Sequence, residues 1–236
     1  VPEVNPQAIL KHKGIIANPN CSTIIMVMAL KPIYDLAKIK RVIVSTYQAV
    51  SGAGKEGIDE LDAQVRDHSE GREMTANILP SASAEKHYPI AFNLIPQIDV
   101  FCDNLYTKEE MKMVNETKKI MEDYEMRITA TTIRVPVYRS HSESVNIELE
   151  KEVDLGAMRE ALAKFPGVTV QDDPSKQEYP MPLYTSEKDD VYVGRLRRDE
   201  SCEKSYNIWV VGDQIRKGAA LNTLQIAETM IKNGWI

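Results

Sequence analysis

An almost unbroken apolar run, Ile24 to Leu30, follows closely on a polar turn. A run of this kind predicts a helix over residues 22–38 that is buried on nearly every side, because an exposed face would need polar residues at helical spacing. Pro32 is expected to kink this helix or to end it. The apolar residues before the turn predict a short buried strand over 14–18. The fold must therefore build a deep core around this one helix.

Cys21 ends the turn and lies at the start of the predicted helix. Unpaired backbone N–H groups and the positive end of the helix dipole favour a thiolate at such a position, and the same N–H groups can hold an oxyanion. These are the requirements of a covalent thiol enzyme. A single cysteine beside apolar residues is more often a small buried hydrophobic side chain, so other residues must decide between the two interpretations.

The composition argues against several classes of protein. The 236 residues carry a net charge of −6, from 29 basic and 35 acidic residues, without any basic run, so we expect no nucleic-acid partner. No window approaches the roughly 18 uncharged apolar residues of a membrane span, and no signal peptide pattern is present, so we expect no membrane partner. The three cysteines are widely spaced, which predicts neither a metal site nor a disulfide framework and favours a reducing, cytoplasmic setting.

The remaining patterns mix strands and helices without regular alternation. The expected strands cover residues 40–47, 127–139, 143–150, 191–197 and 205–211; the expected helices cover 55–67, 108–122, 154–165 and 215–233; residues 68–106 are expected to be irregular. The residues expected to point inward are Ile58, Leu61 and Val65 in the helix over 55–67, and Met111, Val114 and Met121 in the helix over 108–122. This mixture predicts an α+β fold, with a mixed and mainly antiparallel sheet covered by helices.

A glycine-rich segment, Gly52-Ala-Gly-Lys-Glu-Gly, matches the GxGxxG pattern between a predicted strand and a predicted helix. A dinucleotide-binding fingerprint would need a second parallel strand directly after that helix, ending near an acidic residue. The chain continues instead with polar residues from Ser69, which disfavours the fingerprint. A loop that lets a ligand approach the backbone and a simple strand-to-helix turn both remain open.

Five polar residues have unusual positions. Gln48 ends a buried-looking strand, Arg134 lies within an apolar run, and His141 lies between two serines at a strand break, while Glu109 and Lys112 share one helix face. Each has an ordinary interpretation. Arg134 could be an edge-strand charge, His141 a solvated turn residue, and the other two a surface ion pair worth under about 1 kcal/mol.

Combined with Cys21 as nucleophile, these residues supply what a thiol-dependent acyl transfer needs. His141 could move the proton of the thiol and of the adduct, and Arg134 could clamp a substrate carboxylate through two parallel hydrogen bonds. The two residues are seven apart, so they would face opposite sides of one regular strand. The break over 140–142 must therefore turn His141 back toward the site.

Four segments, in this order and spacing, resemble the C-terminal catalytic and dimerisation region of the aspartate-β-semialdehyde dehydrogenase family. The segments are Asn18-Pro-Asn-Cys-Ser-Thr, Ser45-Thr-Tyr-Gln-Ala-Val-Ser-Gly-Ala-Gly, Arg134-Val-Pro-Val-Tyr-Arg-Ser-His and Gly212-Asp-Gln-Ile-Arg-Lys-Gly-Ala-Ala-Leu-Asn. The similarity extends over essentially the whole chain. It implies the fold of a glyceraldehyde-3-phosphate-dehydrogenase-like C-terminal domain.

The resemblance also implies a role for each matching residue. Cys21 matches the nucleophile that forms an acyl-enzyme thioester, His141 the general acid/base, and Gln48 the residue that orients the substrate near the sulfur. Arg134 matches the residue that binds the substrate carboxylate, and Glu109 the one that holds its amino group. The remaining matches are Lys112 and Asn20 at the phosphate site, Ser51 and Gly52 beside the nicotinamide, and Gln214 as a further cofactor contact.

The implied reaction is the reversible, NADP-dependent conversion of aspartate semialdehyde and phosphate into 4-aspartyl phosphate, in the biosynthesis of lysine, methionine and threonine. The resemblance further implies a homodimer or homotetramer. It divides the chain into residues 1–20, the end of a nucleotide-binding domain or a linker; 21–210, the catalytic and dimerisation domain; and 211–236, a helix that packs on the nucleotide-binding domain. That Rossmann domain is missing here, so we expect the chain alone to be inactive.

Two other interpretations stay open. Another acyl phosphate reductase, such as N-acetyl-glutamyl-phosphate reductase, would share the architecture, although Glu109 and Arg134 together favour a free amino acid as substrate. A catalytically silent dimerisation module would predict an unreactive Cys21. A thiol hydrolase is less favoured, because it would leave Gln48 and Lys112 without a role.

Overall fold

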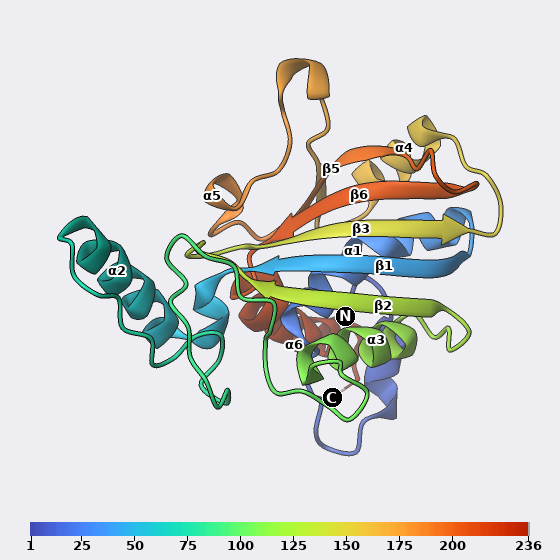
Figure 1. Ribbon diagram of the computed structural model, residues 1–236. Helices are drawn as coiled ribbons and strands as arrows, with labels where there is room; N and C mark the ends of the chain where they lie inside the picture. The colour runs from blue at the N-terminus through green and yellow to red at the C-terminus, as the bar shows by residue number, and fades with distance from the viewer. Residues whose placement is uncertain (236) are drawn as a thin grey trace.

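The computed structural model describes residues 1–235 and builds them around one six-stranded sheet (Figure 1). The strand order is β2 (Arg127–Arg134), β1 (Ile39–Gln48), β3 (His141–Leu149), β6 (Ser205–Gly212), β5 (Val191–Arg198) and β4 (Val168–Val170). β1 pairs in parallel with β2, and β4 with β5, while the three central pairings are antiparallel. The predicted α+β fold with a mixed, mainly antiparallel sheet is confirmed.

The helices cover one face of the sheet and leave the other open. They are α1 (Cys21–Leu36), α2 (Lys55–Ser69), α3 (Lys108–Ile120), α4 (Leu155–Lys164), α5 (Pro182–Thr185) and α6 (Leu221–Asn233). Shorter helical turns are η1 (Pro6–Lys11), η2 (Val50–Ala53), η3 (Pro174–Lys176) and η4 (Arg216–Ala220), the last of these π-helical. Figure 1 shows α1 and α4 behind the sheet and α2 extending to one side. The helix-covered face therefore holds the main core.

α1 is the central element of that core, as its sequence predicts. Every residue from Ser22 to Leu30 is buried, and all seven from Ile24 to Leu30 have no exposed surface. Pro32 lies inside the helix and does not end it. At the start of α4, Asp154 is the N-cap and accepts hydrogen bonds from the backbone N–H groups of Gly156 and Ala157.

The strand expected over 14–18 is wrong. These residues have no regular structure, and the Ile15 side chain is 87% exposed. Within the described residues no strand pairs with this segment, so its backbone forms no inter-strand hydrogen bonds. A short apolar run fixes neither a strand nor its partner, which explains the error.

The inward faces of two helices also differ from the expectation. In α2, Leu61 is buried but Val65 is exposed, and Gln64 takes the buried position beside it. The Gln64 amide donates to the Thr75 carbonyl and accepts from two backbone N–H groups of the long irregular segment, so hydrogen bonding decides this position. In α3 the buried face includes Met113, Thr117 and Ile120, whereas Met111 and Val114 are only half-buried. Met121 follows the end of the helix and is buried, as expected.

The segment over 68–106 is irregular, as predicted, except for its first two residues. These two belong to α2, which ends at Ser69. A second side chain of α2 also holds this segment: the Glu60 carboxylate accepts from the backbone N–H groups of Asn77, Ile78 and Leu79. No strand directly follows α2, so the GxGxxG segment is not part of a dinucleotide-binding unit of the usual order.

Candidate functional site

The candidate site lies at the end of the sheet where β1 and β2 finish and β3 begins. Gln48 and Arg134 are the last residues of β1 and β2 and are paired in the ladder. His141 is the first residue of β3, on the other side of β1. All three side chains are buried on the helix-covered face. The sheet therefore brings together three residues that are far apart in the sequence.

Cys21 is added to this group by α1, whose first residue it is. Asn20 caps the helix by accepting from the backbone N–H of Thr23 at 3.1 Å, and its own amide donates to Glu109 at 2.8 Å. The backbone N–H of Asn20 donates to Glu116 at 2.7 Å. Two carboxylates of α3 thus fix the turn that carries the thiol.

The electrostatics of Cys21 differ from the expectation. Burial, and to a smaller extent the nearby negative charge of Glu109, raise the pKa of the thiol to about 12, against the lowering effects of the Ser22 backbone N–H and of Arg134. The helix N-terminus does favour the thiolate, but desolvation outweighs it. At pH 7 the thiol of the substrate-free protein is therefore protonated. A low reactivity of the resting thiol therefore does not indicate a silent module.

We expect Glu109→Gln to speed alkylation of Cys21 by iodoacetamide about tenfold at pH 8, because removing a nearby negative charge lowers the pKa of a thiol by about one unit. In the unchanged protein the rate should rise about tenfold per pH unit, without a plateau below about pH 10, because ionisation remains incomplete throughout this range. The measurement is the pH dependence of the rate in a protein whose other two cysteines are alanine.

Glu116→Gln is the matched control for that experiment. Its carboxylate also holds Asn20, but its charge is not among those that act on the Cys21 thiol. Equal acceleration by both substitutions would mean that the turn had loosened, not that a charge had been removed.

His141 is turned into the site by a backbone break, as predicted, but the break lies earlier than expected. β2 ends at Arg134 and β3 starts at His141, so the strands predicted over 127–139 and 143–150 are wrong at these ends. Between them, Ser140 adopts a left-handed conformation with φ of 70°, which is uncommon for a residue with a side chain. Its backbone N–H donates to Gln214 at 3.0 Å, which holds this turn.

The hydrogen bonds of His141 fix its protonation state. Burial and the charge of Arg134 hold its pKa well below the usual range, so the ring is neutral. Nδ1 accepts the backbone N–H of Ala49 at 3.1 Å, which leaves the ring proton on Nε2. Among residues 1–235 nothing pairs with Nε2. His141 therefore presents one hydrogen-bond donor to the site.

Arg134 is a buried cation held by the backbone. Its Nη1 donates to the Ala49 carbonyl at 2.8 Å and its Nε to the Pro80 carbonyl at 3.2 Å. Burial lowers the pKa of Arg134 to about 10, although Cys21 and Glu109 act to raise it. This pKa still lies well above 7, so the guanidinium is charged at neutral pH. Around the thiol there is thus one positive side chain and one negative side chain.

Glu109 is mostly buried, and its carboxylate is shared. One oxygen accepts from Asn20 at 2.8 Å and from Gln48 at 3.2 Å, while the other lies 3.6 Å from the Lys112 ammonium. Lys112 itself is 45% exposed and also lies 3.4 Å from Asp99. Glu109 faces the thiol, whereas Lys112 lies at the rim of the site.

The loop after β1 lies against the two basic residues. A Cβ atom on Gly52 would come within 2.7 Å of the Arg134 guanidinium and 3.3 Å of the His141 ring, so only glycine fits this position without displacing them. The neighbouring hydroxyl of Ser51 accepts a hydrogen bond from Gln214. Ser51 and Gln214 are thus buried beside Gly52, whose bare and exposed backbone forms the loop surface next to His141.

Sequence reasoning missed several contributors to the site. Gly218 packs against Cys21, since a Cβ there would lie 3.0 Å from the cysteine Cβ. This glycine lies in a segment that the sequence analysis had selected, so a signal existed. The roles of Ala49 and Pro80 are carried by backbone atoms, which no side-chain pattern reveals.

The chain is similar to known proteins over almost its whole length. The family model described as "Semialdehyde dehydrogenase, dimerisation domain" matches residues 30–217. The chain is 54% identical to aspartate-semialdehyde dehydrogenase of Aquifex aeolicus, covering 100% of this chain and 68% of that protein, and 52% identical to that of Bacillus subtilis, covering 98% and 67%. It thus spans about two thirds of these relatives.

A solved structure gives the same picture. Aspartate semialdehyde dehydrogenase II of Vibrio cholerae, complexed with ASA, superposes with a TM-score of 0.91 at 46% identity, over 98% of this chain and 67% of that one. Among the helices of residues 1–235, none has the length and apolar character needed to cross a bilayer.

Proposed function

Because the chain belongs to the aspartate-semialdehyde dehydrogenase family, a family of oxidoreductases, we propose that it carries the catalytic centre for the reversible, NADP-dependent and phosphate-dependent oxidation of aspartate semialdehyde to 4-aspartyl phosphate. The observation that carries this proposal is the pair of opposite charges around Cys21. Arg134 and Glu109 both act on the thiol and match the carboxylate and ammonium of a free amino acid. An N-acylated substrate would offer Glu109 no ammonium group.

In the proposed reaction the Cys21 sulfur adds to the aldehyde carbon, forming a C–S bond and an oxyanion. The thiol proton passes to that oxygen, and the Nε2–H of His141 stabilises the oxygen by a hydrogen bond as it gains charge; the proton is released to water when the aldehyde carbon is oxidised. Gln48 has both amide hydrogens committed to Thr46 and Glu109, so its oxygen is free to orient the substrate. Arg134 holds the substrate carboxylate throughout.

NADP, when bound, supplies the acceptor for the two electrons that leave the aldehyde carbon. Ser51, Gly52 and Gln214 would hold its ring over the bare loop described above. We place its main binding domain in the third of the relatives that this chain does not span. The resulting thioester on Cys21 is then cleaved by phosphate, which Lys112 and Asn20 would bind, releasing the acyl phosphate and the thiolate.

The test is NADPH formation by the complete gene product, with aspartate semialdehyde and NADP, in the presence and absence of phosphate. Sustained turnover should require phosphate, because phosphate alone regenerates the thiol. N-acetyl-glutamate semialdehyde in the same assay separates the two reductases. A preference for the acetylated substrate would move the assignment to the other enzyme, and no NADPH with either would point to a silent module.

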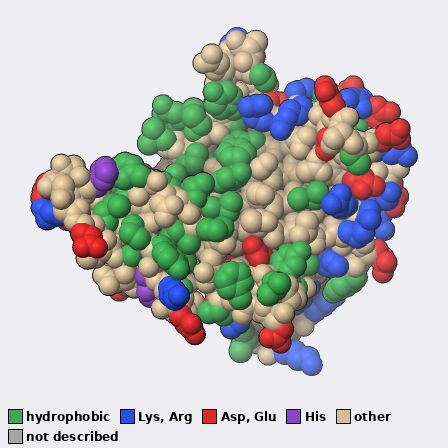
Figure 2. All heavy atoms as spheres, in the orientation of Figure 1, with side chains coloured by type: hydrophobic (Ala, Val, Ile, Leu, Met, Phe, Trp, Pro, Cys, Tyr) green, Lys and Arg blue, Asp and Glu red, His purple; other side chains and the backbone are tan. Residues whose placement is uncertain are grey.

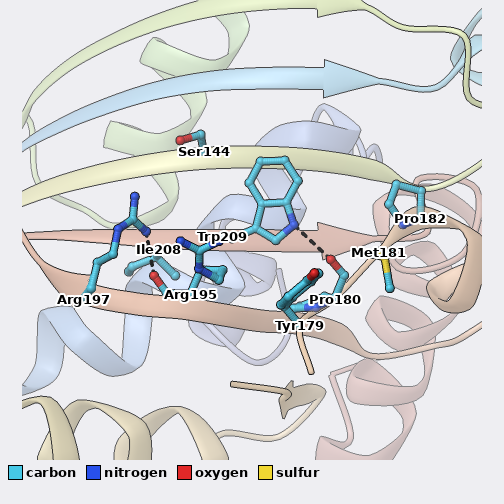
Figure 3. Close-up of a pocket in the computed structure, with 9 residues that line it drawn as sticks. All are labelled: Ser144, Tyr179, Pro180, Met181, Pro182, Arg195, Arg197, Ile208 and Trp209. Atoms are coloured by element: carbon cyan, nitrogen blue, oxygen red, sulfur yellow. Dashed lines mark hydrogen bonds between the residues drawn. The ribbon is translucent and has the colours of Figure 1, made fainter. Parts of the chain in front are cut away.

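We further propose that the open face of the sheet meets a second copy of the chain. A hollow of about 320 Å³ lies on this face. Figure 3 shows residues that line it, with Trp209 donating to the Pro180 carbonyl and lying near Arg195 and Arg197. In Figure 2 hydrophobic side chains gather on the side nearer α2, and charged ones gather at the far ends of the strands. The matched dimerisation model supports this assembly.

Sedimentation of the complete gene product should give at least a dimer, and Trp209→Glu should shift it toward the monomer. Phe165→Glu would be a poor control because this residue packs on the core. Lys40→Glu, on the exposed end of β1, is suitable and should leave the assembly unchanged. The three free thiols support a reducing, cytoplasmic setting for the enzyme.

A further inference from the structure

Glu143 is a buried carboxyl group that the proposed reaction does not use. The residue has no exposed surface, and within the described part of the chain neither of its side-chain oxygens has a hydrogen-bond partner. Burying an unpaired carboxylate is costly, and buried polar groups are nearly always paired. A group of this kind, two residues from His141, requires an explanation.

The sheet register shows where Glu143 lies. Successive rows of side chains cross the helix-covered face, each formed by residues at matching positions of neighbouring strands. The outer row contains Arg134, Gln48, His141 and Gly212; the next contains Thr132, Thr46, Glu143 and Val210; the third contains Ala130, Val44, Val145 and Ile208. Glu143 thus lies in a polar row between the site and the apolar core, directly opposite Thr46.

Thr46 connects this row to the site. Its hydroxyl oxygen accepts from the Gln48 amide at 3.3 Å, and the same amide nitrogen donates to Glu109 at 3.2 Å. The hydroxyl hydrogen of Thr46 also needs an acceptor, because the side chain is fully buried. Opposite residues of an antiparallel pair have Cβ atoms about 4.5–5.5 Å apart, so Glu143 is within reach of this hydrogen through one bridging water.

We propose that Glu143 is a positioning residue: as a neutral carboxylic acid it accepts, through one bridging water, the hydrogen bond that the Thr46 hydroxyl donates, and so holds the Gln48 amide with its oxygen toward the substrate. Without that acceptor the Thr46 hydroxyl would turn its hydrogen toward the Gln48 amide nitrogen and weaken one of the two hydrogen bonds that fix this amide. Burial raises the pKa of Glu143 well above its usual range, in agreement with a neutral acid. The inference rests on the proposed function, in which Gln48 orients the substrate.

Three substitutions in the complete gene product test it. Glu143→Leu and Thr46→Val should each lower kcat about tenfold, the rate equivalent of one hydrogen bond, with KM nearly unchanged because Arg134 and Glu109 still bind the substrate. Glu143→Gln should retain activity within about threefold of the unchanged enzyme, because its carbonyl accepts the same hydrogen. Its pH profile should superimpose on that of the unchanged enzyme.

Thr132→Val is the matched control. It makes the same chemical change in the same fully buried row, at a residue whose hydroxyl faces Thr107 at 3.5 Å and has no bond to Gln48. This variant should leave kcat unchanged. A kcat loss equal to that of Thr46→Val would show that any change in this row is damaging and would overturn the proposal.

A Gln48→Leu background separates positioning from a structural role. There, Glu143→Leu should have no further effect on kcat, because it acts through Gln48. A full tenfold loss in that background, or a shifted pH profile for Glu143→Gln, would overturn the proposal.

Infrared difference spectra of the unchanged protein against Glu143→Gln should show the carbonyl band of a protonated acid at neutral pH. That band tests the neutral acid even if the enzyme fails to oxidise aspartate semialdehyde.

Discussion

Cys21→Ala is expected to lower NADPH formation by the complete gene product at least about 10⁴-fold, because the thioester route has no other nucleophile. The helix start, the Asn20 cap and the two α3 carboxylates all converge on this one side chain. The substitution removes one sulfur atom and leaves these contacts in place. The fold should therefore survive, and thermal unfolding by circular dichroism should be nearly unchanged.

Mass spectrometry tests the same prediction directly. With aspartate semialdehyde and NADP but no phosphate, the unchanged enzyme should gain one aspartyl group, located on Cys21. Cys102→Ala and Cys202→Ala are the controls, since neither residue belongs to the site. Both should form the adduct and turn over normally. An adduct on either of these cysteines, or activity in the alanine variant of Cys21, would contradict a thioester at this residue.

Arg134→Met should lower kcat/KM for aspartate semialdehyde about 10³-fold, equivalent to about 4 kcal/mol of transition-state binding. The guanidinium is almost fully buried, and its loss leaves the substrate carboxylate without its proposed cationic partner. It also removes hydrogen bonds to the Ala49 and Pro80 carbonyls, which should cost about 1–3 kcal/mol of folding free energy. Arg134→Lys keeps the charge but loses the planar guanidinium, so its kcat/KM should lie between that of the unchanged enzyme and that of Arg134→Met.

The measurement is steady-state kinetics with a parallel denaturation curve for each variant. Arg127→Met is the matched control, because Arg127 begins the same strand but lies exposed at its far end. It should change kcat/KM less than twofold, as expected of a surface ion pair worth under about 1 kcal/mol. Equal losses at both positions would indicate general disruption of β2, and binding of the carboxylate would then have to be assigned elsewhere.

Sequence patterns predicted the long elements of this fold well, because their apolar periodicity reports burial directly. α1 and β1 were expected within one or two residues of their observed bounds. The patterns failed where a partner decides the outcome. Ile15 lies in an apolar run that finds no neighbouring strand, and Gln64 displaces Val65 from the buried face because it satisfies backbone groups of a distant loop.

The site shows the same division. Cys21, Gln48, Arg134 and His141 were selected from the sequence as a possible constellation, and the structure places them at one end of the sheet. The direction of the thiol pKa was predicted wrongly, because the helix terminus is visible in the sequence whereas burial is not. Glu143 attracted no interpretation for a similar reason. Its importance depends on the absence of a partner, which only three-dimensional packing reveals.

The alternation of side chains along β1 has an evolutionary consequence. Val44, Thr46 and Gln48 face the helices, whereas Tyr47 lies on the open face beside Trp209. Inserting or deleting one residue within Ile39–Gln48 would exchange the two sets, so that core and catalytic side chains would move to the wrong side together. Gene lineages carrying this centre should therefore tolerate length changes in the irregular segment after α2 but almost none in β1. Selection would then preserve the centre as a unit of fixed length, while the loops around it remain free to diversify.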